Sequence, residues 1–197
     1  MAQTLSQAFL SSPIKFLTKF AVSMDFSQNL HAGLQRFKVE DQLQNDIVIS
    51  GAPAGGQDTF PAYFLPYSDN TVWQIRLGSD ADIMFTPALT GCSFFVGGKR
   101  KNPMISHMNF QDESGGIDQE RIDYNAQSLF DHAITGIPSA LRKADYVPDG
   151  ESAQDHRVYV IGIREKRGLA SSKKWRMYRM KHDPMQKTVS EPPNCFG

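Results

Sequence analysis

The clearest strand pattern in this chain is Arg157-Val158-Tyr159-Val160-Ile161-Gly162-Ile163. A second stretch alternates in the same way, Thr71-Val72-Trp73-Gln74-Ile75-Arg76-Leu77. Successive side chains of a strand point to opposite faces, so this alternation is typical of strands with one buried face. We expect a third stretch, Trp175-Arg176-Met177-Tyr178-Arg179-Met180, to pair antiparallel with the first across a loop at 165–173. These segments predict a protein dominated by strands.

The same criteria extend to the rest of the chain. Strands are expected at 20–26, 46–50, 62–67, 71–77, 92–97, 104–109, 157–164 and 174–181. A loop is expected at 51–59, and a loosely structured tail from Pro184 onward.

Few segments have helical spacing. A central helix is expected over 118–134, where Asp118 can cap the first turn. A short helix opened by Pro138 is expected over 138–144. Apolar residues before position 21 are spaced as on one or two short amphipathic helices interrupted by Pro13. Core packing is the usual role of such a stripe, and a membrane or partner contact is the alternative.

The order of these elements does not repeat a strand–helix–strand unit. We therefore predict an α+β fold: two packed, mostly antiparallel or mixed β-sheets in a sandwich, with a few flanking helices. At 197 residues, the chain has the length of a single domain, 1–197.

Charge and hydropathy narrow the classes of partner. The chain has 21 Lys and Arg against 21 Asp and Glu, so no net field attracts it to nucleic acid or to an anionic membrane. No apolar run approaches the roughly 20 residues of a membrane span. The start of the chain lacks the basic and apolar pattern of a secretory signal. We expect a monomer without a cofactor, without a nucleic-acid partner and without a membrane span.

A cysteine and a histidine are the candidate reactive pair. The stretch Thr86-Pro87-Ala88-Leu89-Thr90-Gly91-Cys92 is followed 15 residues later by His107, on the next apolar run. A cysteine beside a base is the minimum apparatus for thiolate attack on an amide or ester carbonyl. A small buried cysteine and a hydrogen-bonded core histidine are the alternative, and spacing alone does not decide between the two.

A resemblance favours the catalytic interpretation. The stretch Ile83-Met84-Phe85-Thr86-Pro87-Ala88-Leu89-Thr90-Gly91-Cys92 resembles the active-site segment of the cysteine-dependent glutamine deamidase toxins, which include Burkholderia lethal factor and the cytotoxic necrotizing factors. Three further segments are similar to the lethal factor, in the same order: Val22-Ser23-Met24-Asp25-Phe26, Phe64-Leu65-Pro66-Tyr67 and Ile161-Gly162-Ile163-Arg164. Thr90 departs from the usual Ser, and the spacing from cysteine to histidine is longer than in the lethal factor.

The resemblance implies roles for five residues. Cys92 would be the nucleophile, and His107 the base that activates it and then the acid that protonates the departing ammonia. Thr86 would orient the imidazole through its carbonyl or its hydroxyl. The backbone N–H of Cys92 would hold the oxyanion, on a turn that Thr90 and Gly91 form. We expect the imidazole to stabilise the Cys92 thiolate.

The expected activity is hydrolysis of a glutamine side chain to glutamate in a protein substrate. The resemblance implies a host protein, of the translation-initiation helicase or small GTPase class, and a protein that is secreted or delivered from a bacterium and acts in the host cytosol. The same thiol chemistry would also serve a transglutaminase, a cysteine protease or a chemoreceptor-type glutamine deamidase. A non-catalytic binding protein is the alternative of a different class.

The remaining charged residues give weaker signals. Lys99, Arg100 and Lys101 form a basic turn that we expect beside the site, either solvated or in contact with an acidic patch of a substrate. Acidic residues shortly after His107 could supply a third catalytic group or form a solvated loop: Asp112, Glu113, Asp118 and Glu120. The other histidines show no metal-binding spacing, and no metal is expected: His31, His132, His156 and His182.

Overall fold

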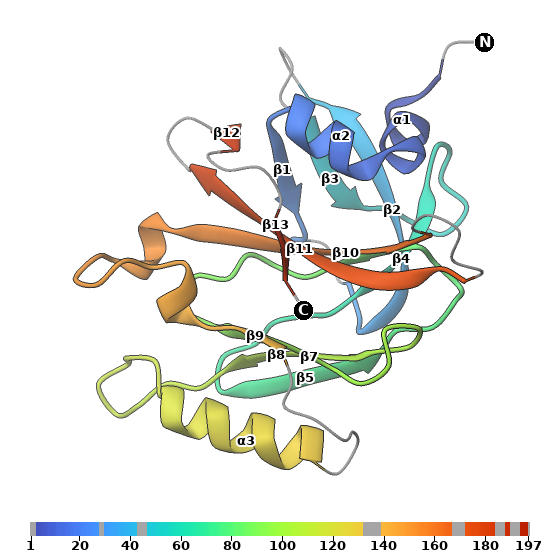
Figure 1. Ribbon diagram of the computed structural model, residues 1–197. Coiled ribbons are helices and arrows are strands. Elements are labelled where there is room, and N and C mark those ends of the chain that lie inside the picture. The colour runs from blue at the N-terminus through green and yellow to red at the C-terminus, as the bar shows by residue number, and fades with distance from the viewer. Residues whose placement is uncertain are drawn as a thin grey trace.

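The computed structural model describes residues 3–27, 30–42, 47–131, 139–166, 172–183, 188–189 and 194–196. These residues build four stacked layers: two short helices, a large mixed sheet, a small antiparallel sheet and a longer helix (Figure 1). Three clusters of buried apolar side chains fill the three spaces between the layers. The predicted α+β class with two packed sheets and flanking helices is confirmed.

The large sheet carries strands from both halves of the chain. Its order is β1 (Val22–Asp25), β3 (Ile47–Gly51), β2 (Gly33–Asp41), β4 (Phe60–Phe64), β6 (Ile83–Phe85), β10 (Arg157–Glu165), β11 (Lys174–Asp183) and β12 (Thr188–Val189), with β13 (Asn194–Phe196) also paired to β11. The pairs β1–β3 and β4–β6 are parallel, and the others are antiparallel. The small sheet has the order β5 (Thr71–Arg76), β8 (Met104–Asn109), β7 (Ser93–Gly97) and β9 (Ser139–Leu141), all antiparallel.

The pair β10–β11 lies toward the end of the large sheet that β12 and β13 complete. Its antiparallel register extends from Arg157 opposite His182 to Glu165 opposite Lys174, as the alternation predicts. Gly162 interrupts the apolar run for a steric reason. A Cβ at this position would lie 3.0 Å from the Cβ of Met84 and 3.1 Å from the sulfur of Met177, on the two neighbouring strands. The glycine therefore lets these two side chains close over β10.

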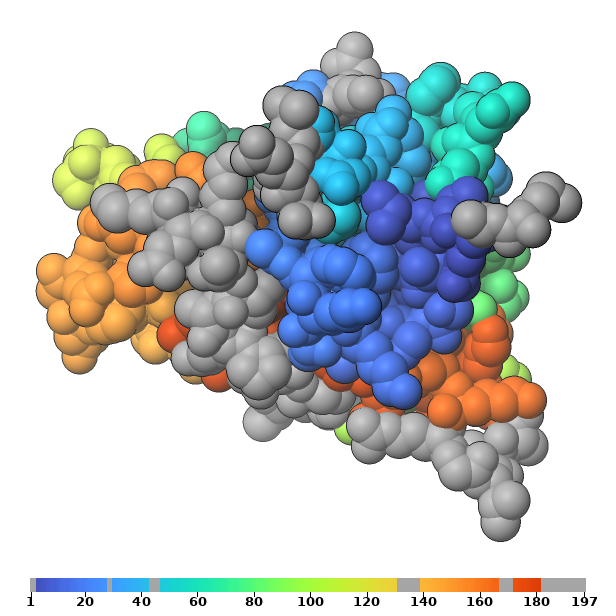
Figure 2. All heavy atoms as spheres, turned by 90° about the horizontal axis from the view of Figure 1, so that it is seen from above, coloured from blue at the N-terminus to red at the C-terminus, as the bar shows by residue number. Residues whose placement is uncertain are grey.

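Two N-terminal helices cover the outer face of the large sheet. They are α1 (Leu5–Ser11) and α2 (Pro13–Lys19), and Figure 2 shows them across the middle of this face. Pro13 occupies the first turn of α2, where its missing N–H is tolerated. Phe9 and Leu17 are fully buried in a cluster that includes Phe37 and Phe85 of the sheet. The amphipathic stripe therefore packs against the core.

A third helix, α3 (Gln119–Asp131), covers the outer face of the small sheet (Figure 1). Asp118 caps it by accepting a hydrogen bond of 2.9 Å from the N–H of Arg121, as predicted. Ile122 and Phe130 pack against Phe95 of β7. The last residues of the predicted helix, 132–134, lie outside the described part of the chain. None of the described helices is long and apolar enough to cross a membrane.

Eight predicted strands and the break at Pro13 are confirmed, two other predictions are wrong, and two strands were missed. Strands β2 and β6 were not expected. Residues 139–141 form β9, which pairs with β7, in place of a helix over 138–144, because the exposed edge of β7 offers backbone partners; Pro138 itself lies outside the described residues. The tail carries β12 and β13, which pair with β11, so it is not loosely structured at these residues.

Candidate active site

The stretch that carries the candidate nucleophile crosses from one sheet to the other. Phe85 still pairs with Ile161 in the large sheet. Leu89 then exchanges two backbone hydrogen bonds with Val158, of 2.8 and 3.2 Å, alongside β10. Ser93 begins β7 in the small sheet. The crossover 86–92 therefore has one end at each sheet.

Thr86 and His107 meet across the space between the two sheets. The Oγ1 atom of Thr86, directly after β6, lies 2.8 Å from Nδ1 of His107 on β8. His107 on β8 lies opposite Trp73 of β5 on one side and opposite Phe94 of β7 on the other. Its side chain is 1% exposed, and that of Thr86 is fully buried. The structure thus brings together two of the three predicted catalytic residues, through the threonine hydroxyl.

Cys92 faces the same space as His107. It directly precedes β7, and its side chain belongs to the same inner cluster as Phe94, which lies opposite His107. Cys92 and His107 are therefore diagonal neighbours on one face of the small sheet, a relation in which residues lie about 7–8 Å apart. The Nε2 atom of His107 is buried and has no hydrogen-bond partner among the described residues. The thiol and imidazole are neighbours without a hydrogen bond between them.

A buried tyrosine fixes the backbone at the cysteine. The N–H of Gly91 donates to the hydroxyl of Tyr146 at 2.8 Å, and that hydroxyl donates to the carbonyl of Cys92 at 2.8 Å. Gly91 has φ of +122°, where a side chain is strained, and a Cβ there would lie 3.2 Å from Ile117. The turn before Cys92 therefore depends on Gly91 and Tyr146, of which the sequence predicted only the glycine.

Burial keeps the pair uncharged. It raises the pKa of the Cys92 thiol to about 11, although backbone hydrogen bonds of Thr90 and of Cys92 itself oppose this shift. Burial also lowers the pKa of the His107 imidazole to about 3. Between these values the thiol keeps its proton and the imidazole is neutral. The expected stabilisation of the Cys92 thiolate by the imidazole is therefore wrong for this structure, because burial of the thiol raises its pKa and burial of the imidazole keeps it neutral.

Tyr67, which the sequence analysis did not single out, packs against the histidine and is held by two further residues. The ring of Tyr67 lies 5.3 Å from that of His107, measured between centroids, and Tyr67 is 39% exposed. The amide nitrogen of Asn109 donates to the Tyr67 hydroxyl at 3.0 Å and to Oδ1 of Asp69 at 2.9 Å. The Tyr67 hydroxyl donates to the same carboxylate. Tyr67 therefore stands between His107 and solvent, held by Asp69 and Asn109.

The basic turn lies at the wrong end of the hairpin to line the site. Lys99, Arg100 and Lys101 follow the end of β7, whereas Cys92 precedes its start. A five-residue strand rises about 3.3 Å per residue, so the two ends are about 16 Å apart. The prediction that this turn lies beside the site is wrong. All three side chains are exposed, and a contact with a protein substrate stays a prediction.

The carboxylates after His107 serve the local backbone. Asp112 accepts hydrogen bonds from the N–H groups of Ser114 and Gly116, at 2.8 and 2.9 Å. Asp118 caps α3. Neither contacts His107 by a hydrogen bond, so the solvated-loop interpretation holds for them. Among the described residues, no group of three or more His, Cys, Asp or Glu is arranged to hold a metal ion.

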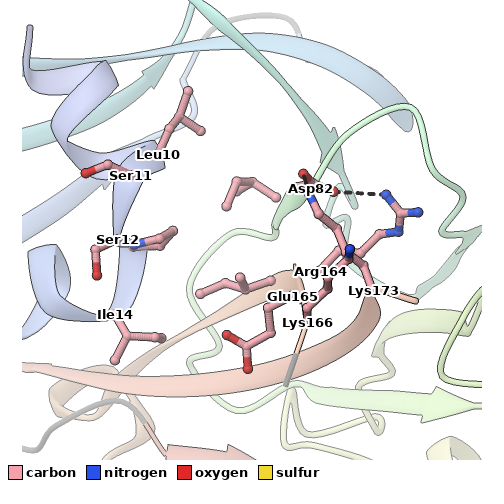
Figure 3. A pocket seen from close by; sticks show the side chains of 12 residues that line it. Leu10, Ser11, Ser12, Ile14, Asp82, Arg164, Glu165, Lys166 and Lys173 are labelled. Carbon is pink, nitrogen blue, oxygen red and sulfur yellow. Dashed lines mark hydrogen bonds and ion pairs between the residues drawn. The ribbon is translucent and has the colours of Figure 1, made fainter. Parts of the chain in front are cut away.

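A separate hollow lies on the helix side of the large sheet. Its volume is about 530 Å³, and the junction of α1 and α2 faces the ends of β10 and β11 across it (Figure 3). Asp82 pairs there with both Arg164 and Lys173. The described residues that line this hollow include none of the predicted site residues. It belongs to a different layer from the cysteine and the histidine.

The fold and the site together define an α+β protein of two packed sheets with a cysteine, a histidine and a threonine buried at the crossover between them. No protein-family model matches the chain, and no curated protein matches it significantly. The sequence analysis identified all three of these residues. It missed Tyr67, Asn109 and Tyr146, because polar residues scattered over different strands and loops carry no local pattern.

Proposed function

We propose that this protein is a cysteine-dependent deamidase that converts a glutamine side chain of a protein substrate to glutamate. The observation that carries the proposal is the hydrogen bond of 2.8 Å between Thr86 Oγ1 and His107 Nδ1. It fixes an imidazole whose other nitrogen has no partner within the described part of the chain, on the sheet face that Cys92 shares. An oriented base beside a thiol is the arrangement that nucleophilic catalysis requires.

This hydrogen bond would determine which nitrogen of His107 carries the proton. If Nδ1 carries the proton and donates it to Thr86 Oγ1, Nε2 has a free lone pair and can accept a proton. In the first step, the Cys92 sulfur attacks the side-chain carbonyl carbon of glutamine while its proton passes to Nε2. Because the resting thiol and imidazole are both neutral, this transfer accompanies attack on bound substrate and does not precede it.

The second step releases ammonia. The carbon–nitrogen bond breaks, the proton on Nε2 passes to the leaving nitrogen, and a thioester on Cys92 remains. Water then attacks the thioester with Nε2 as base, which releases glutamate and restores the thiol. The backbone N–H of Cys92, on the turn held by Gly91 and Tyr146, is the donor we assign to the oxyanion.

The substrate and setting follow from the resemblance to the deamidase toxins. The segments that carry it occupy β6, the crossover 86–92 and parts of β1, β4 and β10. Those toxins act on host proteins, so we propose a host protein as substrate, of the translation-initiation helicase or small GTPase class. We also propose delivery from a bacterium into the host cytosol. Transglutamination and proteolysis differ from deamidation only in the acyl acceptor or in the amide attacked.

A non-catalytic binding protein is the second candidate, and one observation favours it. Cys92 is 2% exposed and its pKa is raised, as for a thiol that only packs in a core. The unpaired Nε2 of His107 speaks against this alternative, because a core histidine normally has both ring nitrogens satisfied.

Incubation with host-cell lysate tests the proposal. The wild-type protein should raise the mass of particular glutamine-containing peptides by about one dalton, and Cys92→Ser should not. Sulfur and oxygen differ little in volume, so circular dichroism and the melting temperature of Cys92→Ser should match the wild type. The chain's other cysteine supplies the matched control, since Cys195→Ser should retain the activity. Equal mass changes with wild type and Cys92→Ser would overturn the proposal.

A further inference from the structure

Two buried polar atoms on one face of β8 lack partners. Nε2 of His107 and Oδ1 of Asn109 have no hydrogen-bond partner among the described residues, and the side chains are 1% and 2% exposed. Residues two apart on a strand share a face, so both side chains lie on the inner side of the small sheet. Leaving a buried acceptor unpaired is unfavourable by about 1–3 kcal/mol. Two such atoms next to a thiol therefore indicate a place that a ligand completes.

The carboxamide of Asn109 is held in one orientation. Its nitrogen donates to Asp69 Oδ1 at 2.9 Å and to the Tyr67 hydroxyl at 3.0 Å. An ionised carboxylate only accepts hydrogen bonds, so the nitrogen must face Asp69. The oxygen is thereby fixed on the other side of the carboxamide, where none of the residues that the structure describes donates to it.

The strand register sets this oxygen beside the nucleophile. Ser93 lies opposite Met108 and Phe94 opposite His107 in the β7–β8 pair. One step further along the same antiparallel register, Cys92 falls opposite Asn109. Directly opposite residues of such a pair have Cβ atoms about 4.5–5.5 Å apart. The extended register thus sets Asn109 beside Cys92.

We propose that Oδ1 of Asn109 recognises the substrate's side-chain carboxamide by accepting a hydrogen bond from its NH₂ group, and that Asp69 is the positioning residue that keeps Oδ1 available. This inference rests on the proposed function. A primary amide carries two N–H donors, whereas an ester or a carboxylate carries none. A site with a buried acceptor discriminates strongly against a ligand that lacks the donor. Asn109 is accordingly a specificity determinant that favours the amide substrate over the carboxylate product.

A pair of small substrates separates recognition from chemistry. The first is N-benzyloxycarbonyl-glutaminylglycine, and the second is the same dipeptide with the glutamine amide replaced by a γ-methyl ester. Both present a carbonyl carbon to Cys92, but only the amide can donate to Asn109. Asn109→Leu keeps the approximate size and removes the acceptor. It should lower kcat/KM for the amide by about 10- to 100-fold and change that for the ester by less than about threefold.

Two further variants keep the experiment interpretable. Asp69 is exposed, so Asp69→Ala should fold normally and should also reduce the amide-to-ester ratio by freeing the carboxamide of Asn109 to turn. Asn125, which donates to the carbonyl of Arg121 on α3, supplies the matched control, and Asn125→Leu should leave the ratio unchanged. Equal losses on both substrates in Asn109→Leu and Asp69→Ala, or no loss on the amide, would overturn the inference and leave the deamidase proposal standing. Failure of the wild type on both substrates would instead contradict the proposed function.

Discussion

Thr86 Oγ1 lies 2.8 Å from His107 Nδ1, and this hydrogen bond joins the end of a strand in the large sheet to the inner face of the small one. Both side chains are buried, so no solvent competes for either partner. The bond fixes the plane of the imidazole and directs Nε2 away from the threonine. The packing of the two sheets therefore orients the imidazole of His107.

Removal of this hydroxyl should impair the base while leaving its ring in place. Thr86→Val keeps the shape and leaves Nδ1 unpaired, which should lower the free energy of unfolding by about 1–3 kcal/mol. Turnover should fall by about 10-fold or more, because Nδ1 no longer holds the required tautomer. Thr86→Ser retains the hydroxyl and serves as the control, with turnover close to wild type. Nitrogen NMR of the His107 ring reads the tautomer directly, and an unchanged spectrum in Thr86→Val would contradict this role.

The buried imidazole should make the protein sensitive to acid. Its folded-state pKa is about 3, below the ordinary value of about 6.5 in an unfolded chain. Between these values the unfolded state binds more protons, so stability is fully present above about pH 6.5 and falls as the pH drops toward 3. The contribution is up to about 1.4 kcal/mol per pH unit. His107→Gln should remove this part of the slope in urea unfolding curves collected at several pH values. Identical slopes for the two proteins would show that His107 is not buried in its neutral form.

Tyr67 should control access to the thiol. The raised pKa of Cys92 predicts alkylation by iodoacetamide at neutral pH about 100-fold or more slower than for a free thiol. Tyr67→Ala uncovers His107 and should speed alkylation of Cys92, which peptide mass spectrometry follows. Tyr124, on the outer side of α3 and 75% exposed, provides the control variant Tyr124→Ala. If Tyr67→Ala leaves the rate unchanged, solvent reaches the pair by another route.

The basic turn should affect protein substrates alone. Lys99, Arg100 and Lys101 are exposed at the end of β7 far from Cys92, too distant to touch a small substrate. Reversal of all three charges should slow capture of an acidic protein substrate and reduce the salt dependence of its rate. Hydrolysis of a glutamine dipeptide should stay within about twofold of wild type. An equal loss on protein and dipeptide would mean that the turn acts on the active site itself.

Much of the fold follows from local sequence patterns. Strands β10 and β11 and their pairing were predicted from their sequence pattern, but β10 is buried on both faces and not on one, because one of its faces lies in each core. Strand β2 was missed because charged residues interrupt its alternation and its burial is uneven. The short strand β6 was missed because three apolar residues make no period. Strand β9 was read as a helix because pairing with β7, a contact between distant segments, overrides local propensity.

The residues of the candidate site also fall into two groups: those that local sequence predicts and those that it does not. Residues within one short stretch, Thr86, Gly91 and Cys92, were identified from spacing and resemblance. Tyr146 and Asn109 could not be identified from local sequence. The hydrogen bond between Tyr146 and Gly91 spans 55 positions, and the one between Asn109 and Asp69 spans 40. The pKa shifts were also beyond reach, because they arise from burial between two sheets.

The most direct test of the central claim is the deamidation reaction carried out in H₂¹⁸O. Host-cell lysate is incubated with wild type or with Cys92→Ser, and peptide masses are compared. If water resolves a thioester on Cys92, each modified glutamine gains about three daltons in H₂¹⁸O against about one dalton in ordinary water, and only with the wild type. A mass change that does not depend on ¹⁸O, or that Cys92→Ser also produces, would contradict hydrolysis by this thiol.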